Sequence, residues 1–100
     1  MKLVRDKIPD MLMKQGRSIQ LRTANDAEYG SMLIRKLREE VDEFIDQRNV
    51  EELADIEEVL RACAEHMKVD WEKVEEARSR KETSRGSFKR RMILDGVTEK

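Results

Sequence analysis

The chain has 100 residues, which is enough for one small domain, and we treat residues 1–100 as a single domain. Apolar residues make up 38% and aromatic residues 4%, so the hydrophobic core is modest and pairing with a second copy would add stability. The 21 basic and 22 acidic side chains nearly cancel, which argues against a nucleic-acid-binding domain.

Other features of the composition bear on location. No apolar run approaches the ~20 residues needed to span a bilayer, and the N-terminus lacks the apolar core of a signal peptide. The single cysteine, Cys63, excludes an internal disulfide framework and fits a reducing compartment. We therefore expect a cytoplasmic protein that contacts neither membrane nor nucleic acid.

The N-terminal third predicts a short helix and a short strand. One proline and four glycines in the whole chain favour long uninterrupted elements over a turn-rich β fold. Pro9 suits the first turn of a helix, and Gly16 suits the position just after its end. Residues 18–23 alternate between polar and apolar side chains, which indicates a short strand.

Two long helices are predicted in the middle of the chain, because apolar residues recur there at spacings of three and four. Asn25 caps the first, which reaches about Gln47, and Asn49 caps the second, which reaches about Met67. Their apolar stripes are Leu33, Leu37, Val41, Phe44 and Ile45 in the first helix, and Leu53, Ile56, Leu60, Cys63, Ala64 and Met67 in the second. The connection between them is short, so the two helices should be antiparallel.

A fourth helix is expected from Trp71 to about Ser84, with Gly86 ending it. Residues 88–94 are basic and then apolar, which indicates a second short strand that could pair with residues 18–22. The predicted fold class is therefore all-α: about four helices in an antiparallel bundle, with two short peripheral β-strands.

Acidic residues recur on the two central helices with a spacing that points to a metal. Glu39-Glu40-x-x-Glu43 lies on the first and Glu52-x-x-Asp55 on the second, and residues three apart share a helix face. At ~100° per residue, Glu40 falls against the apolar stripe of its helix, Glu52 falls inside the next stripe, and Asp55 falls at its border. An acid on a core-facing stripe must be paired, metal-bound or neutral. Oxygen ligands at this density suit Mg²⁺ or Mn²⁺, and Mg²⁺ held by carboxylates usually binds a phosphate.

These acids also have explanations without a metal. Glu52 lies three residues after Asn49 and could complete a capping box. Glu40 and Glu43 could pair with nearby lysine or arginine side chains, and helices commonly carry acids at such spacings. The spacing of these acids is consistent with both interpretations, a metal site and purely structural pairing.

Charge is segregated along the chain. Residues 39–65 contain eleven acids and two arginines, whereas residues 78–91 contain seven basic residues and one acid. A metal–phosphate site needs both kinds of group, carboxylates for the cation and guanidinium or ammonium groups for the anion. The alternative is a pair of solvated helix faces that attract each other weakly.

The acidic motif and three sequence blocks together resemble a known family. The blocks are Leu3-Val4-Arg5-Asp6-Lys7-Ile8-Pro9, residues 52–59 (ELADIEEV) and residues 85–94 (RGSFKRRMIL). With the two acidic pairs, the chain is similar to the MazG-like all-α nucleoside triphosphate pyrophosphatases, and more closely to their small phosphoribosyl-ATP-pyrophosphatase-like members. The resemblance spans nearly the whole chain. The spacer of eight residues between Glu43 and Glu52 is shorter than is usual in the family and indicates a tight turn between the helices.

The resemblance implies roles for particular residues. It implies Mg²⁺, with Mn²⁺ as a substitute, held by Glu40, Glu43, Glu52 and Asp55. Glu39 or Glu43 would be the catalytic carboxylate that takes or orients the proton of the attacking water. Phosphate and substrate binding would fall to Lys81, Arg85, Arg78, Arg5 and Lys7.

The implied reaction is attack of water on the α-phosphorus of a nucleoside triphosphate, which releases pyrophosphate and leaves the monophosphate. The implied protein is a homo-oligomer, most simply a dimer, acting on a nucleotide substrate. One alternative is hydrolysis of phosphoribosyl-ATP itself. Another is a helical module that binds nucleotide or dimerises without turnover.

Overall fold

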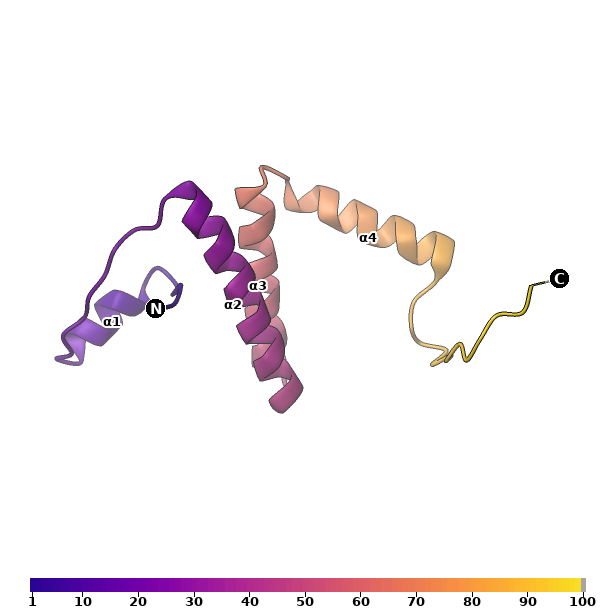
Figure 1. Ribbon diagram of the computed structural model, residues 1–100, viewed down its shortest axis with the longest axis horizontal. Helices are drawn as coiled ribbons and strands as arrows, with labels where there is room; N and C mark the ends of the chain where they lie inside the picture. Colours follow the sequence, from indigo (N-terminus) through magenta and orange to yellow (C-terminus); the bar gives the residue numbers. More distant parts are fainter. Residues whose placement is uncertain (100) are drawn as a thin grey trace. The chain divides into compact units, whose positions relative to one another are not determined.

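The computed structural model describes residues 1–99, and this range contains four α-helices and no strand (Figure 1). The helices are α1 (Ile8–Lys14), α2 (Asp26–Asp46), α3 (Val50–His66) and α4 (Trp71–Arg85). The chain divides into two compact units, residues 1–69 with α1 to α3, and residues from 70 onward with α4. An all-helical fold of four helices is confirmed. Within residues 1–99, no helix combines the length and the apolar character that crossing a membrane requires.

Side-chain caps fix where the two long helices begin. The Oδ1 atom of Asn25 accepts a hydrogen bond from the backbone N–H of Glu28 at 2.9 Å, and α2 starts at the next residue. Asn49 caps α3 in the same way, accepting from the backbone N–H of Glu52 at 2.9 Å. Both caps agree with the sequence prediction, and the second fixes the helical turn that carries Glu52.

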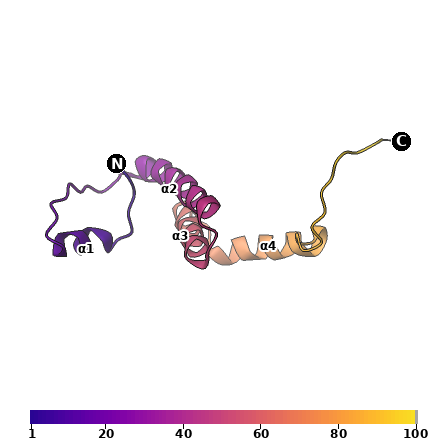
Figure 2. The same ribbon diagram turned by 90° about the horizontal axis from the view of Figure 1, so that it is seen from below.

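In the first unit, α2 and α3 form an antiparallel hairpin (Figures 1 and 2). Four apolar side chains are buried in residues 1–99, and all four belong to this hairpin: Met32, Leu33, Val59 and Ala64. The contact line therefore passes through Leu33 on α2 and Val59 on α3, which are 3% and 8% exposed. Glu40 lies on the same side of α2 as Leu33 and is 6% exposed.

The predicted apolar stripes are wider than the contact between the helices. Five of their members are exposed and form what we name the apolar face of the hairpin: Val41, Ile45, Leu53, Leu60 and Met67. On α2, Val41 and Ile45 lie roughly 80–120° round the helix from Leu33, because each residue advances by ~100°. One neighbouring helix covers only the centre of such a stripe, so its edge stays open to solvent.

The two predicted β-strands are absent from residues 1–99. Residues 18–23 have irregular backbone conformation, and residues 88–94 form a bend, a turn and an irregular stretch. Leu21 and Ile93 are largely exposed. Alternation over six residues does not form a strand without a hydrogen-bonded partner, and a two-stranded ribbon of that length is marginal in water. The prediction of strands there was therefore wrong.

Candidate metal centre

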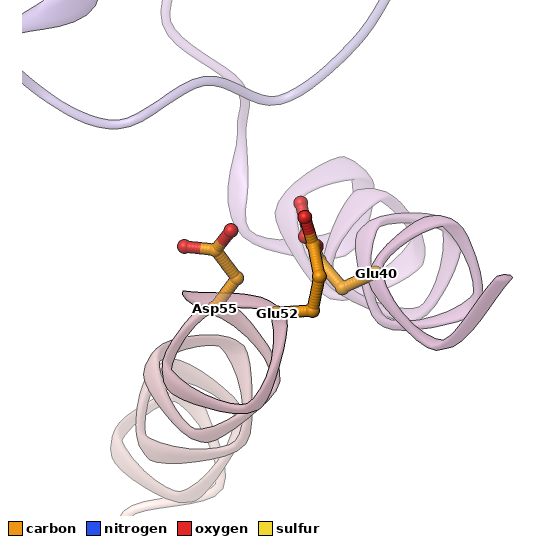
Figure 3. A group of neighbouring side chains, drawn as sticks. All are labelled: Glu40, Glu52 and Asp55. Atoms are coloured by element: carbon orange, nitrogen blue, oxygen red, sulfur yellow. The ribbon is translucent and has the colours of Figure 1, made fainter. Parts of the chain in front are cut away.

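Three carboxylates from the two packed helices meet in the first unit (Figure 3). Glu40 comes from α2, and Glu52 and Asp55 come from the first two turns of α3. One oxygen of each side chain lies within 4.8 Å of an oxygen of the other two. Figure 3 shows the carboxylates of Glu52 and Asp55 rising from one helix beside that of Glu40 on its neighbour. Helical periodicity in the sequence predicted that these three acids lie along the sides of the helices that carry the apolar stripes.

Two oxygens in this group are buried without a partner. Glu40 Oε2 and Glu52 Oε2 have almost no contact with solvent and no hydrogen bond to any residue from 1 to 99. A buried polar atom without a hydrogen bond is costly, and a buried charge is more so. A small divalent cation would satisfy both atoms, and an all-oxygen donor set is the one that Mg²⁺ and Mn²⁺ prefer. The residues present therefore fit the metal that the sequence motif implies.

Electrostatics at Glu40 reflect competition between burial and a lysine. Burial raises the pKa of the Glu40 carboxyl, the hydrogen bond and charge of Lys36 lower it, and the charges of Glu43 and Asp55 raise it further. The net result is a pKa above the usual value of 4.5. The ammonium of Lys36 therefore compensates only part of the cost of burying this charge.

Lys36 is a site residue to which the sequence motif assigned no role. Its Nζ atom lies 3.2 Å from Glu40 Oε1 and 3.3 Å from Glu39 Oε1, and its side chain is 18% exposed. Burial lowers the pKa of Lys36, but the hydrogen bonds and charges of Glu40 and Glu39 outweigh burial and raise it overall. The spacing of three and four residues to the two glutamates was the available signal.

The N-terminal segment reaches the acids through Arg5. The guanidinium Nη2 of Arg5 lies 2.7 Å from Asp55 Oδ1, in a contact that joins residues fifty positions apart. Between this segment and the α2–α3 hairpin runs a groove of about 540 Å³. Arg5, Lys7 and Lys36 line it together with Glu40 and Asp55, so basic and acidic groups share one depression.

Two predicted acids lie outside the group of three. Glu39 is half-buried and pairs with Lys36, whereas Glu43 is exposed one turn beyond Glu40 on α2. The charge of Glu43 still acts on Glu40, since it contributes to the raised pKa of that carboxyl. Their assigned roles, proton acceptor for Glu39 and ligand or proton acceptor for Glu43, stay predictions.

The remaining basic residues of the prediction belong to α4, in the second unit. Lys81 and Arg85 are exposed there. Arg78 pairs with Glu75 at 2.7 Å and with Glu82 at 2.6 Å, and the hydrogen bonds and charges of these two acids raise its pKa. Arg78 would have to exchange these partners to bind a phosphate, so Lys81 and Arg85 are the better candidates. Phosphate binding by all three stays a prediction.

Comparisons with protein families, with characterised proteins and with solved structures find no match to this chain.

Proposed function

We propose that the protein is a Mg²⁺-dependent hydrolase that converts a nucleoside triphosphate into the monophosphate and pyrophosphate. The observation that carries the proposal is the buried carboxylate of Glu40, which has one oxygen without a hydrogen bond and belongs to a group with Glu52 and Asp55. An acid on an open helix surface would be exposed, and a fully paired acid would leave no buried oxygen without a hydrogen bond. The resemblance of the acidic motif and the three sequence blocks to the MazG-like pyrophosphatases gives the reaction class.

The proposed roles combine the positions of the side chains with the resemblance to the pyrophosphatases. Glu40, Glu52 and Asp55 would hold the ion, with Glu43 as the fourth proposed ligand. A bound Mg²⁺ supplies positive charge for the phosphate oxygens and a water of lowered pKa. Glu39 is the proposed acceptor of the proton from the attacking water, and its pairing with Lys36 holds the carboxylate near Glu40.

Positive charge for the triphosphate comes from side chains around the same groove. Arg5 and Lys36 already contact the acids, and Lys7 lines the groove near them. Once a cation satisfies Asp55, the guanidinium of Arg5 is available for a phosphate, which it can bind through two parallel N–H groups. Phosphate binding by Lys81, Arg85 and Arg78 of α4 is also part of the proposal.

We also propose that the protein is a homodimer. The apolar face of the hairpin carries side chains that are between 38% exposed at Val41 and 70% exposed at Met67. A second copy presenting the same face would cover it through a two-fold interface, in which each copy contributes the same residues.

A pyrophosphate-release screen tests the enzymatic proposal. The panel contains ordinary and damaged nucleoside triphosphates and phosphoribosyl-ATP, each with Mg²⁺, and compares the wild type with Glu40→Gln. We expect release from at least one nucleotide and a loss of roughly 100-fold or more in the variant, since even residues that only support metal ligands affect activity by about 10–100-fold. Glu57→Gln on α3 is the matched control, because Glu57 is exposed and pairs with Arg61.

The outcomes separate the alternatives. Unchanged activity in Glu40→Gln would refute the ligand assignment. Release of pyrophosphate from phosphoribosyl-ATP alone would favour a phosphoribosyl-ATP pyrophosphatase. Nucleotide binding without release from any compound would leave a binding module.

A further inference from the structure

The groove that opens on the acids extends well beyond them. On α2 it is lined from Glu40 back to Tyr29, and on α3 from Asp55 forward to Glu65. At 1.5 Å per helical residue, either span is about 15 Å long. The volume of about 540 Å³ is that of an ordinary small-molecule pocket. The site therefore has room for a ligand much longer than a hydrated metal ion.

The two ends of the groove differ in chemistry. At one end, Arg5 and Lys36 lie beside the carboxylates of Glu40 and Asp55. At the other end, Tyr29 faces the groove with Met11 among its lining residues. An end with basic groups beside the candidate metal ligands and an end with an aromatic ring match a ligand with a polyphosphate at one end and a flat ring system at the other.

Tyr29 is held in place before any ligand arrives. Its ring meets the ring of His66 edge to face, with centroids 5.3 Å apart. Gly30 allows this approach, since a Cβ atom there would lie 2.9 Å from Cε1 of His66. A ring fixed in this way loses little conformational entropy when a ligand packs on it.

Negatively charged groups act on the tyrosine hydroxyl. Burial raises the pKa of Tyr29, and the charges of Glu65 and Asp6 raise it further, so both carboxylates act on this end of the groove. Carboxylates accept hydrogen bonds, and a nucleoside offers donors in its ribose hydroxyls and base N–H groups.

We infer that Tyr29 binds the nucleoside part of the substrate, with the base against its ring and the triphosphate toward Glu40 and Asp55. This inference rests on the proposed function and extends it, because it makes Tyr29 a specificity-determining residue. The enzyme then distinguishes a nucleotide from a bare polyphosphate by contacts at the far end of the groove.

The test compares two probes in the wild type and in Tyr29→Leu and Tyr29→Phe. The probes are the nucleoside triphosphate of the panel that binds most tightly by calorimetry and inorganic tripolyphosphate, both with Mg²⁺. The readout is the Kd from calorimetry, with the KM added where pyrophosphate is released. We expect Tyr29→Leu to weaken nucleotide binding roughly tenfold, as loss of one base–aromatic contact does, with tripolyphosphate binding changed less than about twofold. Tyr29→Phe keeps the ring and should stay near the wild type for both probes.

A control and a second variant complete the experiment. Ile34→Ala alters an exposed apolar residue of α2 outside the groove lining and should affect neither probe. Met11→Ala should reproduce the selective loss more weakly, because Met11 also lines the groove. Equal losses for both probes, or unchanged nucleotide binding in Tyr29→Leu, would overturn the inference. Calorimetry registers these outcomes even if no pyrophosphate is released, so this inference and the proposed reaction fail separately.

Discussion

At the scale of single residues, Glu40 is the side chain that most distinguishes a site from a charged surface. It is 6% exposed, and Lys36 satisfies only its Oε1 oxygen. The raised pKa indicates that the effect of burial on this carboxyl is larger than the opposing effect of Lys36. The ionised carboxylate therefore destabilises the folded chain when no metal is bound. The folded protein is less stable because of this carboxylate, and metal binding would restore that stability.

Glu40→Gln should therefore separate stability from metal binding. Without metal we expect the variant to melt a few degrees higher at neutral pH, because glutamine carries no charge to desolvate and Lys36 keeps Glu39 as its partner. A gain of about 1 kcal/mol corresponds to roughly 4–8 °C for a domain this small. Addition of millimolar Mn²⁺ should raise the Tm of the wild type and not that of the variant. An unchanged Tm of the wild type in millimolar Mn²⁺ would count against the metal site.

The pH dependence of the same comparison has a definite sign. The pKa of Glu40 is higher in the folded state than its usual value of 4.5, so its contribution favours folding at low pH and is lost as pH rises through the folded-state value. The metal-free Tm difference between Glu40→Gln and the wild type should be small below roughly pH 4, grow as the pH rises towards the folded-state pKa, and stay constant above it. Thermal melts of both proteins across this range measure it, and a difference independent of pH would contradict the assignment.

At the scale of elements, the start of α3 connects helix capping to the site. Asn49 caps the turn that carries Glu52, and Asn25 caps α2 with the same 2.9 Å hydrogen bond, far along the helix from Glu40. Asn49→Ala and Asn25→Ala should each cost about 1 kcal/mol of stability. Only Asn49→Ala should also weaken Mn²⁺ binding, since fraying of that turn displaces Glu52. Chemical denaturation and metal titration of both variants check this, and equal effects on metal affinity would refute it.

Local signals explain what the sequence predicted correctly. The caps at Asn25 and Asn49 and the end of α4 at Gly86 depend on residues within one turn, and the facing of Glu40, Glu52 and Asp55 follows from helical periodicity. These features need no knowledge of distant contacts.

The incorrect and missing predictions concern features that depend on contacts with distant segments, which local sequence patterns do not reveal. Alternation in residues 18–23 indicated a strand, but a strand also needs a neighbour along its edge. The predicted apolar stripes included Ile45 and Leu53, but only α2 and α3 pack against each other in residues 1–69, so these two side chains stay exposed. The contact of Arg5 with Asp55 joins distant positions, so spacing alone could not identify it.

At the scale of the whole molecule, the hairpin of the first unit has two sides with opposite chemistry. The groove side of α2 carries Tyr29, Lys36 and Glu40, whereas Val41 and Ile45 lie ~100° or more round the helix from Lys36. A helical chain of this length with four buried apolar side chains in residues 1–99 has a small core. Pairing through the apolar face would enlarge that core and leave the groove open to substrate.

The homodimer proposal therefore predicts a specific loss of association. Sedimentation equilibrium should give the wild type twice the chain mass of 11.8 kDa, and Ile45→Glu or Leu53→Glu should return it to the mass of a single chain. Both residues are more than half exposed in the isolated chain, at 57% and 55%, so the new charge is tolerated in a monomer but not against an apolar partner. Met13→Glu, at an α1 residue that is 50% exposed and outside the apolar face, should remain dimeric. A wild type that sediments as a single chain at tens of micromolar, or variants that keep the double mass, would show that another surface or no surface mediates pairing.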